Sequence, residues 1–368
     1  MQQPLLIAKI ELYKLSIPLK EPFITSLGRD DFARNVLVKI QTSEGITGFG
    51  ECSPYMAISG ESQDTCYTVG GYFATLFKGK NALDIEERVE EMDKLIYGNT
   101  SIKSAFDMAL YDIAAQHAGV PLYKFLGGNK NKTISTDYTV SIGEPEKMAK
   151  DAIKIRDEGY SAIKVKLGKD GKKDVQRIKA IRQAVGKEIP LRIDANQGWN
   201  ADEAIETLKA LSAFDIQHCE EPIPRWDFMK LPGIRNASPI PIMADESCGD
   251  EHDAERLISI KACDYMNIKL GKSGGIFKAL KIVKLAADAG IHLQVGGFVE
   301  SRLAMTAFAH FSLCHPLIEH FDFDTALMFS EDPVTGGIIY SKDGVITVPD
   351  TPGLGAFIGE KMISKWCR

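Results

Sequence analysis

From about Thr133 onward, short apolar segments alternate with segments whose apolar residues recur every three or four positions. One of these longer segments places Val175, Ile178, Ile181 and Val185 at that spacing. Apolar residues spaced in this way lie along one face of a helix, whereas the short apolar runs between helices are typical of buried strands. Repeated alternation of strand and helix predicts a parallel sheet covered by helices.

Eight such strands can be read from the sequence: ISTDYTVSI, AIKVKLG, LRIDANQ, IQHCEEP, PIMADES, MNIKLGK, LQVGGF and EHFDFD. One residue near the end of each strand marks the register: Thr139, Lys166, Asp194, Glu220, Asp245, Lys269, Gly297 and Asp322. Successive markers are 24 to 28 residues apart. Eight strand-helix units of this size predict an α/β fold of the (β/α)₈ TIM-like barrel type over residues 129–334, with polar residues gathered at the carboxyl ends of the strands.

The residues before the barrel have a different pattern. KIELYKLSI and NVLVKIQTSEGITGFGE read as strands, the second with a hairpin around Ser43, Glu44 and Gly45, and helical segments follow to about Gly128. We therefore predict an α+β capping domain at residues 1–128. The last segment, about 335–368, predicts a hairpin outside the barrel that returns to the first domain.

Composition excludes some classes of function. The chain of 368 residues has a net charge of −6, with 44 basic and 50 acidic residues interspersed, which argues against a nucleic-acid partner. No apolar stretch approaches the roughly 20 residues of a membrane span, and the start has no basic segment before a long apolar run. Seven scattered cysteines without a CxxC pair are typical of a reducing compartment, so we expect a cytoplasmic protein without a membrane partner.

Two nucleotide-binding motifs are also excluded. GKSGG would need a glycine five residues before Gly271 to form a phosphate-binding loop, and Met266 stands there. GLGAFIG near the C-terminus has the wrong spacing for a dinucleotide fingerprint and opens no strand-helix-strand unit.

A pair of lysines in the second strand indicates chemistry. Lys164 and Lys166 are two residues apart, so both side chains point to the same side of the strand. Solvated lysines on the outside are the alternative, but helices cover the outside of a barrel, which favours the inward orientation. Two neighbouring ammonium groups lower each other's pKa, so we expect one of them to act as a general base.

Asp194, Glu220 and Asp245 end the third, fourth and fifth strands. Each acid alone could be a helix cap or a solvated loop residue. Three inward carboxylates at one rim would repel one another without a cation, and an all-oxygen set favours Mg²⁺ over zinc. Lys269 ends the sixth strand, four strands from Lys166, so the two lysines should face each other across the barrel mouth.

These residues resemble the enolase superfamily, in its muconate-lactonizing branch, which has a KxK on strand two, acids on strands three to five and a lysine on strand six. AFDMALYDIAAQHAGVPLYKFLGG is also similar to the segment before the barrel in that branch, and DAN, EEP and ADES stand at the places of its three ligand motifs. The resemblance implies one Mg²⁺ per subunit and removal of a proton α to a carboxylate. It also implies that Lys166 serves the (R) carbon and Lys269 the (S) carbon.

The end of the eighth strand is similar to one group of enzymes within this branch. HFDFD supplies Asp322 and Asp324, spaced to face the same way, and in dipeptide epimerases of this branch, such as those acting on L-Ala-D/L-Glu, a DxD at this place binds the terminal ammonium of the substrate. Solvated loop acids are the alternative. By the same resemblance, the expected substrate contacts are Thr139, Lys164, Gly297, Val299, Asp322 and Asp324. Asn196, Glu246 and Glu300 are expected to be hydrogen-bond partners behind the lysines and the metal ligands.

Specificity should lie in two capping loops, EPFITSLGRDD and SPYMAISGES, at Phe23, Ile24, Gly28, Arg29 and Met56. Epimerases for dipeptides ending in glutamate place an arginine where Gly28 stands here, beside Arg29. We therefore expect an isomerase that inverts the C-terminal residue of hydrophobic dipeptides and assembles from several copies. A lactonizing cycloisomerase, an o-succinylbenzoate synthase and a metal-dependent binder without turnover are the alternatives.

Overall fold

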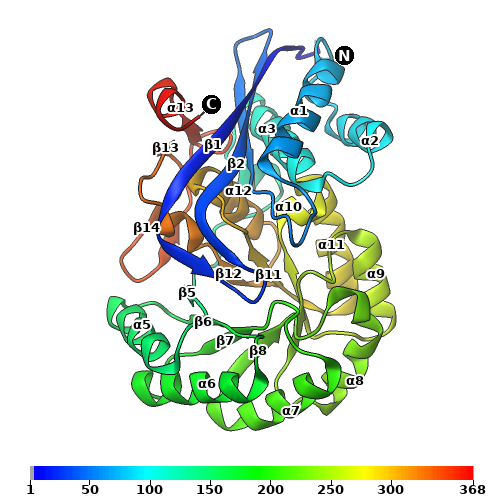
Figure 1. The fold of residues 1–368 in the computed structure, drawn as a ribbon. Helices are drawn as coiled ribbons and strands as arrows, with labels where there is room; N and C mark the ends of the chain where they lie inside the picture. Colours follow the sequence, from blue (N-terminus) through cyan, green and yellow to red (C-terminus); the bar gives the residue numbers. More distant parts are fainter. Residues whose placement is uncertain (1–3, 368) are drawn as a thin grey trace.

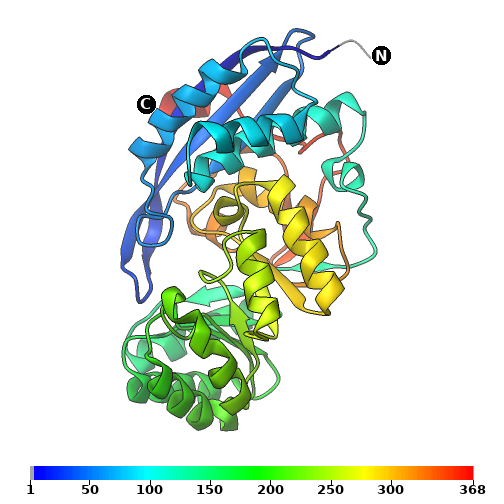
Figure 2. The same cartoon turned by 90° about the vertical axis from the view of Figure 1, so that its right-hand side faces the viewer.

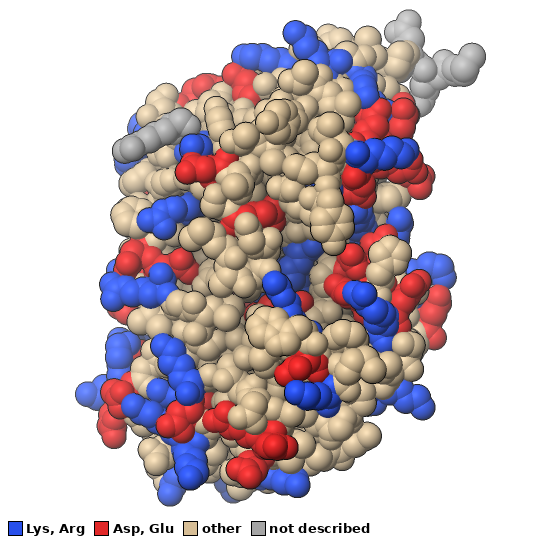
Figure 3. Space-filling view, turned by 45° about the vertical axis from the view of Figure 1, so that its right-hand side comes forward, with Lys and Arg blue, Asp and Glu red and all other residues tan. Residues whose placement is uncertain are grey.

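The computed structural model describes residues 4–367 and consists of a barrel with an α+β layer beside it, as Figures 1 and 2 show. The first three residues of the predicted capping domain and the last residue of the predicted tail lie outside the described residues. Charged side chains of both signs are interspersed over the face shown in Figure 3. No helix within residues 4–367 is both long and apolar enough to cross a membrane.

The barrel is one eight-stranded sheet in which neighbours along the chain are also neighbours in space, in the order β5 to β12. Every adjacent pair runs parallel. The first and last strands approach each other where the Asp137 N–H donates to the Phe321 carbonyl at 3.2 Å, so the sheet nearly closes. The strands are β5 (Tyr138–Val140), β6 (Ile163–Lys166), β7 (Leu191–Asp194), β8 (Ile216–Glu220), β9 (Ile242–Ala244), β10 (Tyr265–Ile268), β11 (His292–Gly296) and β12 (Ile318–Asp322). The predicted barrel is confirmed.

Helices follow the strands and cover the outside of the sheet (Figure 1). They are α5 (Pro145–Glu158), α6 (Gly171–Val185), α7 (Ala201–Leu211), α8 (Leu231–Ala237), α9 (Glu251–Ser259), the short α10 (Leu270–Ser273), α11 (Ile276–Ala289) and α12 (Arg302–Ser312). α6 buries Ile178, Ile181 and Val185, as their spacing predicts. Its carboxyl end is capped by Gly186, whose φ of +82° is a backbone conformation that glycine adopts without strain.

The first barrel strand is shorter than its sequence suggests. The segment ISTDYTVSI is divided into β4 (Ile134–Ser135), which pairs with β15 of the C-terminal region, and β5. Between them Thr136 and Asp137 are fully buried, and the Thr136 N–H donates to the Gly344 carbonyl at 3.0 Å. The chain therefore changes pairing partner within this segment because its backbone donors are satisfied outside the barrel.

The α+β layer contains an antiparallel sheet, in the order β1 (Ile7–Ile24), β2 (Arg29–Thr42) and β3 (Thr47–Cys52). The helices α1 (Gln63–Phe77), α2 (Ile85–Leu95), α3 (Thr100–His117) and α4 (Leu122–Phe125) follow. The long β1–β2 hairpin extends from this layer to the barrel (Figure 2). Its tip is fixed there, since Ser26 Oγ donates to the Asn196 carbonyl at 2.8 Å and the Ile142 N–H donates to the Ile24 carbonyl at 3.1 Å.

The C-terminal residues lie between the two parts. β14 (Ile339–Tyr340) and β15 (Val345–Thr347) form a hairpin, and β13 (Val334–Gly336) pairs with β16 (Ala356–Ile358). The final helix α13 (Glu360–Trp366) contacts β1. The domain boundaries at residues 128 and 334 stay a prediction.

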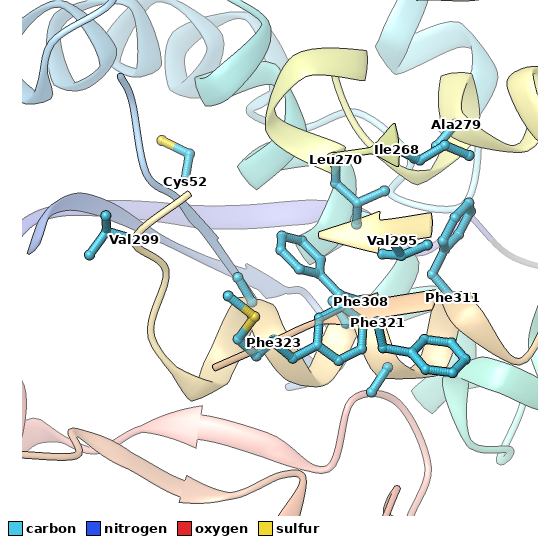
Figure 4. Close-up of a cluster of buried hydrophobic side chains, with 14 of the residues drawn as sticks. Cys52, Ile268, Leu270, Ala279, Val295, Val299, Phe308, Phe311, Phe321 and Phe323 are labelled. Atoms are coloured by element: carbon cyan, nitrogen blue, oxygen red, sulfur yellow. The ribbon is translucent and has the colours of Figure 1, made fainter. Parts of the chain in front are cut away.

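One part of the core joins the barrel wall to α12. Figure 4 shows Phe308 and Phe311 of α12 beside Phe321, Phe323 and Val295, and all five are buried. Full burial of a side chain of this size stabilises the fold by about 1.5–3 kcal/mol. This packing holds the last two barrel strands, whose ends carry part of the candidate site.

Candidate active site

A cavity with an empty volume of about 440 Å³ lies where the capping hairpin meets the carboxyl ends of the barrel strands. The capping layer contributes Phe23, Thr25, Leu27, Tyr55 and Ile58. The barrel contributes Thr139, Lys166, Asn196, Lys269, Gly297, Phe298, Val299, Asp322, Asp324 and Thr325. Residues that are far apart in sequence therefore form one apolar wall and one charged wall.

The second barrel strand positions the predicted lysine pair. All four residues of β6 are buried, and Lys166 ends the strand in register with Asp194 on β7. The chain then turns at Gly168, whose φ is +101° and whose added Cβ would lie 2.0 Å from the Ala195 carbonyl oxygen. Only glycine allows the backbone to pass this close, so the two strand ends can stay side by side.

Both lysines of the pair point inward and bind carboxylates. Lys166 Nζ donates to Asp194 Oδ2 at 2.6 Å. Lys164 Nζ lies deeper and donates to Glu220 Oε2 at 2.8 Å and to Asp322 Oδ2 at 2.7 Å. The inward orientation predicted for both residues is the one that the structure has.

The predicted effect of one lysine on the other is wrong for Lys164. Burial lowers the pKa of Lys164, but the negative charges of Asp322, Glu220 and Asp194 outweigh it and raise that pKa well above its usual value. Carboxylates outnumber ammonium groups around this side chain, so repulsion between the lysines does not control its charge. The charged form of Lys164 is therefore favoured, and its ammonium group links three anionic side chains.

Lys269 lies on the opposite side of the barrel mouth. It follows β10, which is four positions from β6 in the sheet. Lys269 Nζ is 2.8 Å from Asp245 Oδ2. Burial lowers the pKa of Lys269, whereas the charges of Asp245 and Glu220 raise it by more, so the net shift is upward. The cavity therefore has one ammonium group on each side.

Sequence reasoning missed Lys272. Its Nζ donates to Asp245 Oδ1 at 2.5 Å and to the Asn267 carbonyl at 3.0 Å, and it also contacts the Asp245 carbonyl. Lys272 lies three residues after Lys269, in the short helix α10. This spacing places the two side chains near each other and is the feature of the sequence that could have indicated the contact. Lys272 fixes the orientation of the Asp245 carboxylate.

The three predicted metal ligands are fully buried at neighbouring strand ends, where Asp194 pairs in register with Glu220. Burial raises the pKa of Asp194, and the charges of Lys166 and Lys164 outweigh this and lower it. For Glu220, burial and the charge of Asp194 raise the pKa. Among residues 4–367 no three His, Cys, Asp or Glu side chains are arranged as ligands of one ion, because each carboxylate faces a lysine.

The donor set nevertheless suits Mg²⁺. All three side chains are oxygen donors and two of them carry depressed pKa values, as a hard cation requires. Considering residues 4–367, Asp245 Oδ2 is buried and accepts no hydrogen bond, although Lys269 lies nearby. The buried, all-oxygen donor set therefore fits the ion.

The predicted ammonium site at the end of β12 faces the same cavity. Asp322 accepts from Lys164; burial raises the pKa of Asp322, but the positive charges of Lys164 and Lys166 outweigh this and lower it to about 2. Asp324 Oδ2 accepts from the Thr139 N–H at 2.7 Å, whereas within the described chain its buried Oδ1 accepts no hydrogen bond. Burial and the charge of Asp322 raise the pKa of Asp324 well above its usual value. A cation beside Oδ1 would compensate for the burial of this carboxylate and for its repulsion by Asp322.

The predicted supporting residues lie around the same centre. The Asn196 N–H donates to Asp194 Oδ1 at 2.9 Å, and Asn196 Nδ2 donates to Glu246 Oε1 at 3.3 Å. Glu300 Oε2 accepts from the Phe298 N–H at 2.5 Å, and burial with the charge of nearby Glu51 raises the pKa of Glu300 to about 8.

The specificity residues are divided between two cavities. Phe23 lines the first, together with Leu27 from the same hairpin. Gly28, Arg29 and Met56 line an adjoining cavity of about 810 Å³. Arg29 is directed away from the site, because its side chain is 60% exposed and its Nη2 lies 2.8 Å from Asp31 Oδ1. Ile24 is held by its backbone pairing with Ile142.

Comparison with known proteins gives the same picture for both parts of the chain. Residues 8–127 match the family model of the mandelate racemase / muconate lactonizing enzyme N-terminal domain, and residues 147–362 match the enolase C-terminal domain-like model. The D-Ala-D/L-Ala epimerase of Cytophaga hutchinsonii is 57% identical over 352 residues, which cover 96% of each chain.

Solved structures agree. A dipeptide epimerase from Cytophaga hutchinsonii, complexed with Mg and the dipeptide D-Ala-L-Val, has a TM-score of 0.97 and 56% identity and covers 98% of each chain. A dipeptide epimerase from Enterococcus faecalis, complexed with Mg and L-Leu-L-Tyr, has a TM-score of 0.93 and 36% identity over 95% of this chain and 99% of its own. With both family models matched and relatives aligned along nearly its whole length, this chain belongs to the enolase superfamily, in the group of mandelate racemase and muconate lactonizing enzyme.

Proposed function

We propose that the protein is a Mg²⁺-dependent dipeptide epimerase, an isomerase that inverts the α-carbon of the C-terminal residue by proton transfer. The observation that carries this proposal is one cavity lined by Lys166 and Lys269 from opposite sides and by the Asp322 and Asp324 carboxylates. A dipeptide has an acidic α-proton beside one terminal carboxylate and an ammonium group at its other end, so it matches all four groups. The names of the relatives support the same activity.

In this proposal the two lysines exchange the proton. Lys166 removes or returns it on the (R) face and Lys269 on the (S) face, each as a general base or acid. Asp194, Glu220 and Asp245 would hold Mg²⁺, which supplies positive charge beside the substrate carboxylate as negative charge develops there. Lys164 keeps Glu220 and Asp322 in place, and Lys272 does so for Asp245.

At the other end of the substrate, the terminal ammonium would lie against Asp324 Oδ1 and Asp322. Burial disfavours the ionised form of Asp324, and a bound ammonium favours it. Thr139 fixes this carboxylate through its backbone N–H. The backbone around Gly297 and Val299 lines the cavity between the two ends.

The apolar wall indicates the preferred side chain. Leu27, Tyr55, Ile58 and Phe298 face the cavity, whereas Arg29 points away from it and pairs with Asp31. A glutamate side chain would lose water there without gaining a cation. We therefore propose that dipeptides with a small first residue and Ala, Val or Leu second are better substrates than Ala-Glu.

The test is incubation with a dipeptide library in D₂O, with α-deuterium and inversion followed by mass spectrometry and NMR. Epimerisation with deuterium uptake and without bond cleavage is expected, whereas ring formation would indicate a cycloisomerase and the absence of exchange a binding protein. To test the side-chain preference, kcat/KM is compared for Ala-Val and Ala-Glu. The value for Ala-Val should be higher by at least about tenfold, which corresponds to the burial of one or two methylene groups. Preference for Ala-Glu that is lost in Arg29→Ala would show that the arginine turns inward.

The setting of the enzyme is also part of the proposal. We place it in the cytoplasm and expect several copies to assemble. The seven free cysteines of the described chain agree with a reducing compartment.

A further inference from the structure

Lys269 has a neighbour on each side. On one side its Nζ lies 2.8 Å from Asp245 Oδ2. On the other it lies over the ring of Phe298, 4.8 Å from the ring centroid. Both residues are buried, so little water competes for the ammonium group. The position of Lys269 is therefore set by one carboxylate and one aromatic face.

Lys166 has the same arrangement with different residues. Its Nζ lies 2.6 Å from Asp194 Oδ2 and 5.9 Å from the ring centroid of Phe23. Phe23 is half-buried and belongs to β1, whereas Phe298 belongs to the loop after β11. The two lysines thus face the cavity from opposite sides, and each has its own acid and its own ring.

The capping layer holds both rings. Tyr55 stacks on Phe298, with centroids 5.9 Å apart and ring planes 18° apart. The loop that carries Phe298 is tied to the capping sheet, because Asn35 Nδ2 donates to the Val299 carbonyl at 2.8 Å and the Val299 N–H donates to Ser53 Oγ at 3.2 Å. Phe23 is itself part of that sheet. The capping layer therefore supplies the ring beside Lys166 and braces the barrel loop that carries the ring beside Lys269.

We propose that Phe298 and Phe23 are positioning residues, one for each base: the ring of Phe298 holds Lys269 for proton transfer on its face of the substrate, and the ring of Phe23 holds Lys166 on the other. This inference rests on the two-lysine reaction proposed above and adds a separate support for each lysine.

An aliphatic side chain would exclude water equally well but would not attract the ammonium group. The negative face of an aromatic ring does, by an amount that depends on distance and desolvation. Phe298 is closer to its lysine, more buried and braced by Tyr55, so its loss should have the larger effect. Without the ring, the lysine is drawn toward its carboxylate alone and away from the substrate α-carbon.

Single-lysine variants isolate each pair. In Lys166→Ala, α-proton exchange in D₂O depends on Lys269, and there we expect Phe298→Leu to lower kcat for exchange about tenfold and Phe23→Leu to lower it by clearly less. In Lys269→Ala the order should reverse, with Phe23→Leu costing about threefold. Both rings line the cavity, so KM should change as well, but the loss that identifies a positioning role is the one in kcat, and Phe298→Tyr or Phe23→Tyr should recover most of it.

Equal slowing by both Leu variants in both backgrounds would overturn the pairing, as would losses confined to KM, which would make the rings a substrate wall. A crystal structure of each Leu variant in the otherwise native enzyme needs no turnover: the matching lysine Nζ should leave its position and the other should keep it. An unmoved lysine overturns the inference whatever the rates are. Absence of exchange in the native enzyme would instead contradict the proposed epimerase, so the two failures are distinguishable.

Discussion

Three barrel strands carry two inward polar layers, and the two layers differ in chemistry. The carboxyl ends of β7, β8 and β12 carry Asp194, Glu220 and Asp322, and we call these acids, together with the charged side chains at the ends of the other strands, the rim layer. Two residues earlier, the same strands carry Arg192, His218 and His320, which we call the base layer. Side chains two apart on a strand face the same side, so both layers point into the barrel, about 6.6 Å apart along the strands.

The base layer is held by one arginine and by ring contacts, and within the described chain His218 Nδ1 and His320 Nε2 have no hydrogen-bond partner. Arg192 donates to Asp137 at 2.9 Å and to Gln217 at 2.8 Å, and its Nη2 contacts His320 Nδ1 at 3.0 Å. The ring centroids of His218 and His320 are 5.0 Å apart. Its ion pair joins Arg192 to Asp137, and burial lowers the pKa of both histidines.

At the rim layer, charged side chains of both signs line the cavity: Lys166, Lys269, Asp322 and Asp324. Four lysines and the acids around them are ion-paired there, and in the described chain Asp245 Oδ2 and Asp324 Oδ1 accept no hydrogen bond. Asp245 Oδ2 has Lys269 beside it, whereas Asp324 Oδ1 has no cation, and a ligand that supplies one there relieves the cost of burying this oxygen. The same strands therefore carry groups for ligand chemistry at their carboxyl ends and groups for stability two residues earlier. Substitutions in the rim layer should change activity, and substitutions in the base layer should change the free energy of unfolding.

The largest expected effect is in the rim layer. Asp194→Asn or Glu220→Gln should fold but lose Mg²⁺ affinity and at least about 10³-fold in kcat, since an anionic ligand that supports several kcal/mol of charge stabilisation is gone. Titration calorimetry with Mg²⁺ and the epimerisation rate measure the two losses. Full activity of the native enzyme in excess chelator would remove the basis for the metal site.

The next largest effect separates the two lysines that face opposite sides of the substrate. Lys166→Ala should abolish epimerisation yet retain deuterium exchange of the (S) isomer, which faces Lys269, and Lys269→Ala should retain only (R) exchange. The lost exchange should fall by about 10²–10⁴, the usual contribution of general acid–base catalysis. NMR of each isomer in D₂O is the measurement. Exchange of both isomers by either variant is incompatible with two bases.

In the base layer, Arg192→Met should change stability rather than chemistry. It leaves the buried Asp137 unpaired, and breaking a buried ion pair costs about 3–5 kcal/mol. Urea unfolding measures this loss, and kcat of the folded variant should stay within about threefold. The control is Arg192→Met with Asp137→Asn, which should recover more than half of the lost stability. If kcat falls as far as in the rim variants, the two layers are not separable.

The smallest expected effect is a pH dependence of the free energy of unfolding that arises from the histidines of the base layer. Burial lowers the pKa of His218 well below its usual value and that of His320 to about 3. Both folded-state values lie below the unfolded value of about 6.5, so below that pH the unfolded chain binds more protons and the free energy of unfolding falls.

Between pH 7 and pH 5 each histidine should remove about 2 kcal/mol from the free energy of unfolding. Other groups titrate in the same range, so the comparison is between the native protein and His218→Phe, which keeps a ring beside His320 and Tyr265. Urea unfolding at both pH values should show a loss on acidification that is smaller in the variant by about that amount. Equal losses in both proteins would mean that His218 is already protonated in the fold.

Much of the fold and of the rim layer could be predicted because both follow from short-range rules. The alternation of strand and helix gave the barrel, and the period of 24 to 28 residues placed Lys166, Asp194, Glu220, Asp245 and Lys269 at successive strand ends. The strand period of two made Lys164 and Lys166 face the same way. These rules need no knowledge of what lies across the barrel.

The tertiary structure alone decided which side chains meet. The contact of Tyr55 with Phe298 joins residues far apart in sequence, and no periodicity encodes the docking that creates it. The raised pKa of Lys164 depends on carboxylates from three other strands, and the sequence shows only the neighbouring lysine. A strand fixes the direction of its own side chains, whereas charge state and contacts depend on distances through space, which are set only when the capping layer packs onto the barrel.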